Sequence, residues 1–172
     1  MKRDLLLCFF EADPYRARWT ETIQQEWLQN AKEKYPGFSE KMSRTDELMR
    51  NYFGDAWVEG YEHFIDLVEL QDDPDDRHVV AAAIKCKAQY VVTDNLKHFP
   101  EDVLSEFDLE RGTADKFLAS TFEHYPHQAL QVIRDHRSGL NSAPSESEYL
   151  MMLVAKGLPL LSSRIKPHRN AI

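Results

Sequence analysis

The sequence is poor in cysteine and glycine and carries no excess of positive charge. Cys8 and Cys86 lie far apart in apolar stretches, which predicts buried free thiols in a reducing compartment rather than a zinc motif. The apolar run Leu5–Phe10 is too short to cross a bilayer and is not laid out as a signal peptide. We therefore expect a cytoplasmic protein that has no membrane partner.

With only six glycines, the chain also lacks a glycine-rich phosphate-binding loop. The net charge of −8 and the pI of about 5.4 argue against binding to nucleic acid through a broad basic face. An enzyme that touches RNA at one small site remains compatible with this charge, and an acidic surface suits a basic protein partner. The 42% hydrophobic residues supply a proper core.

Caps, apolar periodicity and helix stops predict helices over much of the chain. Thr20 is a candidate N-cap, Ile23, Trp27 and Ala31 recur every four residues, and Pro36 stops that helix. Helices are predicted over residues 21–34, 40–53, 77–87, from 114 behind a Thr113 cap, 127–139 and 146–156, followed by a basic tail, "SSRIKPHR".

Apolar runs without helical periodicity give the expected sheet. Leu5–Phe10 is a buried element that fits either a helix or a strand. Residues 64–70 and 89–93 are predicted as short strands, and the helix over 77–87 would join them in a right-handed parallel crossover.

Four aspartates precede the helix over 77–87, namely Asp72, Asp73, Asp75 and Asp76. One interpretation is capping: Asp73 as N-cap, Pro74 at the first helical position and the later acids favoured by the helix dipole. The other is a metal site, because this cluster and "TDN" each follow a predicted strand at the same edge of a sheet. Carboxylates that converge there suit Mg²⁺ or Mn²⁺, which could activate water for phosphodiester hydrolysis.

Three motifs occur in order: "YRARWTETIQQEWLQN", "PDDRHVVAAAI" and "VTDNLKHFP". With them, the chain from "KRDLLL" to the "LP" near Leu158 resembles the PIN-domain family, and within it the VapC-like toxin ribonucleases of bacterial toxin–antitoxin systems. The resemblance implies an α/β fold, a three-layer α/β/α PIN-like domain with a central, mostly parallel sheet. It implies an acidic cluster that binds Mg²⁺ or Mn²⁺ and cuts RNA, and a DNA-binding antitoxin partner.

The resemblance assigns site residues by their positions in these three motifs. Glu26 of "QQEW" and Asp76 of "PDDRH" match metal-binding acids, and Thr93 and Asn95 match groups that orient water or phosphate. The family often has an acid directly before the final Phe; the candidate to replace it as a ligand is Asp94.

That acid position is occupied here by His98, for which a surface role is favoured over a direct one. Asp73 and Asp75 are expected to act as caps or to support the ligands. The segment "SRIKPHR" could contact the RNA backbone, although a solvated tail is favoured.

Members of this family begin with a strand whose central Asp is a metal ligand, and the resemblance places that strand before Met1. Three explanations stay open: a natural or mis-assigned short form, deliberate shortening, or a degenerate member. A missing strand would leave unpaired edges that another chain can fill, so a homo-oligomer is expected. The site would also lose one carboxylate ligand, so weak or absent activity is expected. The division expected is a shortened PIN-like domain over residues 1–140 and a helical extension with basic tail over 141–172.

Two other functions compete with the toxin ribonuclease. One is a non-catalytic PIN-like module that binds a partner or oligomerises. The other, which ignores the resemblance, is a generic phosphate-binding α/β protein that uses helix N-termini as its anion site.

Overall fold

The computed structural model describes residues 1–70 and 73–172, so Asp72 lies outside the described residues. Contacts divide the chain into two compact units. The first unit comprises Met1–Ala17, Val92–Asn95 and Gly112–Ile172, and the second comprises Arg18–Val91 and Leu96–Arg111. The expected division at residue 140 stays a prediction.

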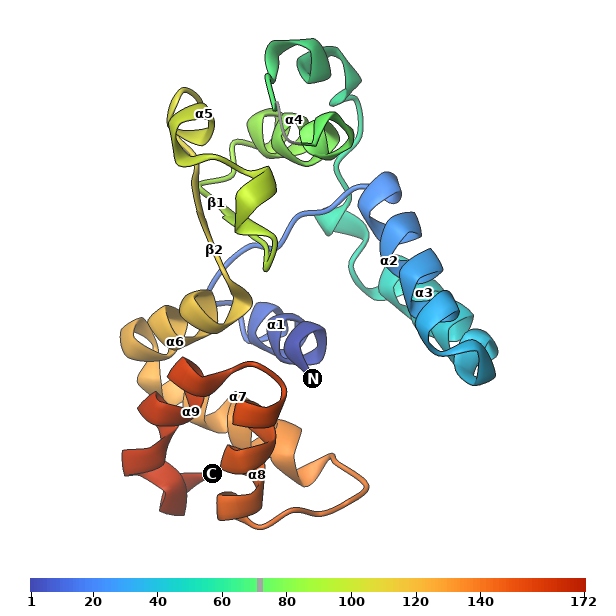
Figure 1. Ribbon diagram of the computed structural model, residues 1–172. Coiled ribbons are helices and arrows are strands. Elements are labelled where there is room, and N and C mark those ends of the chain that lie inside the picture. The colour runs from blue at the N-terminus through green and yellow to red at the C-terminus, as the bar shows by residue number, and fades with distance from the viewer. Residues whose placement is uncertain (71–72) are drawn as a thin grey trace. The chain divides into compact units, whose positions relative to one another are not determined.

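The first unit is a helical bundle (Figure 1). The residues Leu5–Phe10, which fitted a helix or a strand, lie in a helix whose buried Leu5 and Phe9 face the core. This helix packs against two later ones, which in turn contact the last two. The helices are α1 (Lys2–Glu11), α6 (Ala114–His124), α7 (Pro126–Ser138), α8 (Glu146–Ala155) and α9 (Pro159–Ile165), followed by the 3₁₀ helix η6 (Lys166–Ala171).

The basic tail is helical rather than irregular, and its basic side chains are exposed as the expectation of a solvated tail requires, while Ile165 is buried. Leu158, Leu161 and Ile165 recur at helical spacing and are fully buried. They join Tyr149 and Leu153 in the core of the first unit. The basic side chains of α9 and η6 point outward, and Arg164 forms an ion pair with Glu123.

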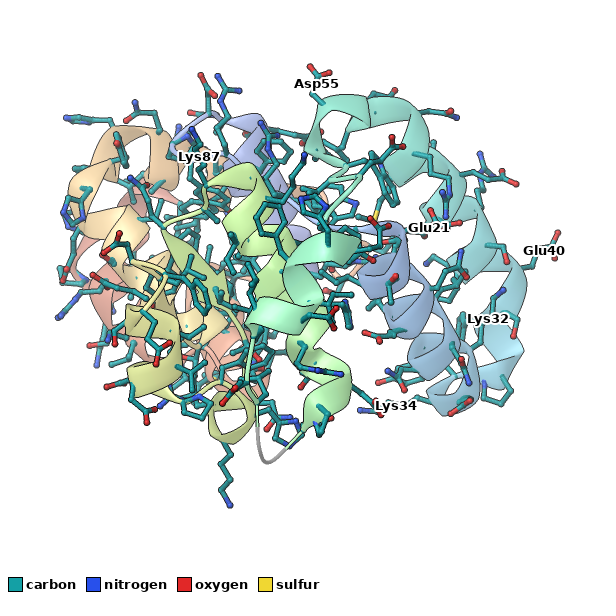
Figure 2. All side chains as sticks on the ribbon, turned by 90° about the horizontal axis from the view of Figure 1, so that it is seen from above. Glu21, Lys32, Lys34, Glu40, Asp55 and Lys87 are labelled. Atoms are coloured by element: carbon teal, nitrogen blue, oxygen red, sulfur yellow. The ribbon has the colours of Figure 1, made fainter. Side chains whose placement is uncertain are left out.

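The second unit carries the remaining helices, namely α2 (Glu21–Lys34), α3 (Ser39–Tyr52), α4 (Arg77–Cys86) and α5 (Glu101–Ser105), with 3₁₀ turns η1 (Pro36–Phe38), η2 (Gly54–Ala56), η3 (Glu62–Leu67), η4 (Pro74–Asp76) and η5 (Leu96–His98). The predicted cap of α2 is confirmed, because the Ile23 N–H donates to Thr20 Oγ1 at 3.1 Å. Hydrogen bonds from Arg50 to Glu21 join α3 to α2 and lower the pKa of Glu21 to about 2. Figure 2 shows Glu21, Lys32 and Lys34 along α2, beside Glu40 of α3.

The predicted strand over residues 64–70 is wrong. Most of this segment lies in η3, and the backbone becomes extended only at Val68. Val68 and Leu70 are buried while Leu67 is largely exposed, and no strand among the described residues pairs with this segment.

The sheet described by the structure has two strands, β1 (Tyr90–Val92) and β2 (Glu110–Gly112). The Glu110 N–H donates to Gln89 O and the Thr93 N–H donates to Gly112 O, so the pairing advances along both strands and is parallel. The predicted strand over 89–93 is confirmed, but its partner follows it in sequence, and the expected crossover before it is wrong. The chain is thus mostly helical, with a small parallel sheet, an arrangement compatible with the α/β class.

Within residues 1–70 and 73–172, no helix is both long and apolar enough to cross a membrane. Cys8 and Cys86 are free thiols, as predicted, although both are half-buried.

Candidate metal centre

The local structure at the start of α4 agrees with the capping interpretation. Asp73 is the N-cap of η4, and its Oδ1 accepts a hydrogen bond from the Asp75 N–H at 3.2 Å. Pro74 occupies the first helical position, where its missing N–H costs nothing. The turn continues into α4, which has Asp76 as its N-cap residue.

Capping leaves two carboxylate oxygens of this turn directed at one imidazole. His98 Nδ1, at the end of η5, lies 2.7 Å from Asp73 Oδ2 and 2.9 Å from Asp76 Oδ2. The three ligand atoms lie within 4.8 Å of one another, and each residue is partly buried. His98, for which the sequence favoured a surface role, is therefore a neighbour of both aspartates.

The chemistry of this group fits a divalent cation. A neutral imidazole nitrogen carries at most one hydrogen, whereas two carboxylates of the helix turn face it. Neighbouring carboxylates repel each other unless positive charge lies between them. Carboxylate oxygens and imidazole nitrogen are both common ligands of divalent metals.

Glu26 has a different partner. Its Oε1 lies 3.1 Å from Nε2 of His78, and the Glu26 side chain is about half exposed whereas His78 is buried. The other ring nitrogen of His78 has no hydrogen-bond partner among the described residues. His78 was not among the predicted site residues, although it stands two places after Asp76 in "PDDRH". The role of Glu26 as a ligand stays a prediction.

The residues of "TDN" belong to the first unit. The Asn95 N–H donates to Thr93 Oγ1 at 3.1 Å, which closes a tight turn after β1. Asp94 Oδ2 lies 2.7 Å from Nζ of Lys2, so this carboxylate already has a cationic partner. Asp94 would have to give up this ion pair to bind a metal, and its role as a ligand stays a prediction.

A mostly helical α/β chain with carboxylates and an imidazole gathered at one helix start defines a candidate metal-binding protein. Residues 114–167 match the family described as the VapC50 C-terminal domain. The chain is similar to a protein of Mycobacterium tuberculosis named "Putative ribonuclease VapC50", with 26% identity over 132 residues that cover 77% of each chain. No solved structure matches the chain. These two matches support the VapC-like family of PIN-domain toxins that the sequence resembles.

Proposed function

We propose that this protein is a metal-dependent endoribonuclease, the toxin of a toxin–antitoxin pair. The observation that carries the proposal is the group formed by Asp73, Asp76 and His98 in a chain that resembles the VapC-like family. The name of the mycobacterial relative describes that protein as a ribonuclease. The proposal includes the three-layer α/β/α PIN-like arrangement expected from the sequence.

Asp76 is the central ligand in this proposal, with Asp73 and His98 beside it, and the ion is Mg²⁺ or Mn²⁺. A divalent cation held there would supply Lewis-acid stabilisation of a phosphoryl oxygen and a lowered pKa of bound water. Asp73 keeps its Oδ1 on the Asp75 N–H, so one carboxylate both caps the turn and offers Oδ2 to the site.

Glu26 is proposed as a further acid of the same centre. His78 holds its carboxylate at 3.1 Å through a buried ring, which fixes an otherwise mobile surface side chain. Thr93 and Asn95 are proposed to orient water or a phosphate oxygen of the substrate. Asp94 is proposed as an alternative ligand once Lys2 releases it.

The proposed partners follow from the charge and the family. The chain, at a net charge of −8, would meet RNA at this local site rather than along a basic face. An acidic surface suits a basic, DNA-binding antitoxin, and a homo-oligomer and action in the cytoplasm belong to the same proposal. The PIN-like domain over residues 1–140 and the extension over 141–172 are its proposed parts.

Cleavage of a mixed panel of labelled RNAs in Mn²⁺, with and without EDTA, tests the proposal. We expect EDTA to abolish cleavage and Asp76→Asn to lower it at least about a hundredfold, as loss of a metal ligand should. Asp55→Asn, which alters an exposed acid in the same unit (Figure 2), should leave the rate unchanged.

Cleavage that survives EDTA or Asp76→Asn would overturn the proposal. So would a complete lack of cleavage across the panel in a folded protein that binds the metal. That second result would favour the non-catalytic interaction module instead.

A further inference from the structure

We propose that His98 is a direct nitrogen ligand of the metal and that it makes the centre prefer a first-row transition ion to Mg²⁺. The inference rests on the proposed metal centre and names the residue that selects its ion. Its basis is the geometry around His98 Nδ1 and the chemistry of an imidazole among carboxylates.

The distances around His98 match those between neighbouring ligands of one ion. Ligand bonds of about 2.1 Å at right angles place two adjacent ligand atoms about 3 Å apart. His98 Nδ1 lies 2.7 Å from Asp73 Oδ2 and 2.9 Å from Asp76 Oδ2. The ion could therefore lie between the ring nitrogen and the two carboxylate oxygens with little movement of these side chains.

The three side chains are held in place by the surrounding backbone. Phe99, the residue after His98, is buried with Val91 and Leu104 in an apolar cluster, which anchors the end of η5. Asp73 is fixed by its cap bond, and Asp76 belongs to the turn that starts α4. Ligands that are fixed before the ion arrives lose little conformational freedom on binding.

An imidazole changes which ion such a centre favours. Mg²⁺ prefers oxygen ligands and gives up its waters reluctantly. First-row transition ions accept imidazole readily, and their affinity for a given site rises from Mn²⁺ to Co²⁺. With two carboxylates and one imidazole, we expect Co²⁺ to bind more tightly than Mn²⁺, and Mn²⁺ more tightly than Mg²⁺.

Calorimetric titration of the whole chain with Mn²⁺, Co²⁺ or Mg²⁺ alone tests this order. We expect the wild type to bind Co²⁺ at least about tenfold more tightly than Mg²⁺. His98→Ala should weaken Co²⁺ and Mn²⁺ by about tenfold or more and Mg²⁺ by much less. His98→Asp, an all-oxygen site, should bring the Co²⁺ and Mg²⁺ affinities closer together. The matched control is His127→Ala, which removes an exposed imidazole on α7 and should change nothing.

Pulsed electron paramagnetic resonance of the Mn²⁺-loaded wild type gives a second readout that does not depend on a variant's stability. An imidazole ligand produces nitrogen modulation of the electron spin echo. We expect this modulation in the wild type and in His127→Ala, and its loss in His98→Asp.

Several outcomes would overturn the inference: no nitrogen modulation in the wild type, equal Mn²⁺ affinity in the wild type and His98→Ala, or tighter binding of Mg²⁺ than of Co²⁺. RNA cleavage whose ion preference is the same in the wild type and the His98 variants would contradict this inference but leave the proposed function standing. Conversely, His98-dependent metal binding without RNA cleavage would leave His98 as the ligand and remove the proposed function.

Discussion

The two units differ in the partners of the polar side chains that they bring together. In the first unit, these groups serve the backbone or each other. Asp115 accepts hydrogen bonds from the Leu160 and Leu161 N–H groups, both at 2.9 Å, and Ser162 donates to Leu150 O at 3.0 Å.

In the second unit, ionisable side chains face one another around the start of α4. Asp73 and Asp76 share one imidazole, and buried His78 holds Glu26. Polar groups that satisfy a backbone are explained by folding alone, whereas like charges gathered around one nitrogen are not. The difference locates the candidate ligands Asp73, Asp76 and His98 in the second unit and assigns a supporting role to the buried polar groups of the first.

The largest effect that distinguishes the two units is expected at Asp115. Asp115→Ala should lower the free energy of unfolding by about 2 kcal/mol, because it leaves two backbone N–H groups at the start of α9 without their acceptor. Chemical denaturation followed by circular dichroism measures this loss, and calorimetry should find metal affinity unchanged.

Asp135→Ala, at an exposed acid of the same unit, is the matched control and should cost less than about 0.5 kcal/mol. A tenfold drop in metal affinity in folded Asp115→Ala would contradict the division of roles between the two units.

The helices were predictable because their signals are local. Thr20 caps α2, and Pro36 follows its end, so Glu21–Lys34 could be placed from the sequence alone. Strand β2, "ERG", could not, because a glycine after two charged residues disfavours a strand and only pairing with β1 makes one. Helix α9 was not predicted either, because its basic residues indicated a solvated tail although Leu161 and Ile165 are buried.

The candidate site was predictable in part. The aspartates before α4 are visible as a cluster, and the resemblance singled out Asp76. The contact between Asp76 and His98 spans 22 residues and depends on how η5 is placed against η4. The partnership of His78 with Glu26 spans 52 residues and joins two helices. Such contacts are tertiary, and no local pattern predicts them.

A smaller effect is expected at His78. His78→Gln should lower the rate of RNA cleavage about tenfold, which is about 1.4 kcal/mol in activation free energy. The shorter side chain would no longer hold the Glu26 carboxylate in the same position. Rates measured for His78→Gln, Glu26→Gln and the double variant form a cycle. If His78 acts through Glu26, the double variant should be no slower than Glu26→Gln. Additive losses would instead make His78 a purely structural residue of α4.

The smallest effect is a pH dependence of stability that originates in the first unit. Burial lowers the pKa of His136, whose Nδ1 lies 2.9 Å from the hydroxyl of buried Tyr149, and the charge of Asp4 opposes this shift in part. Because the folded pKa lies below the unfolded value, the unfolded chain binds more protons between the two values. The contribution of His136 to stability is therefore complete above about pH 6.5, the ordinary histidine value, and is lost as the pH falls through the folded pKa.

We expect the free energy of unfolding to fall less between pH 7 and pH 5 in His136→Gln than in the wild type. His127→Gln, which changes an exposed histidine on the same helix, should keep the wild-type slope. An unchanged slope in His136→Gln would show that the pH dependence of stability arises from other groups.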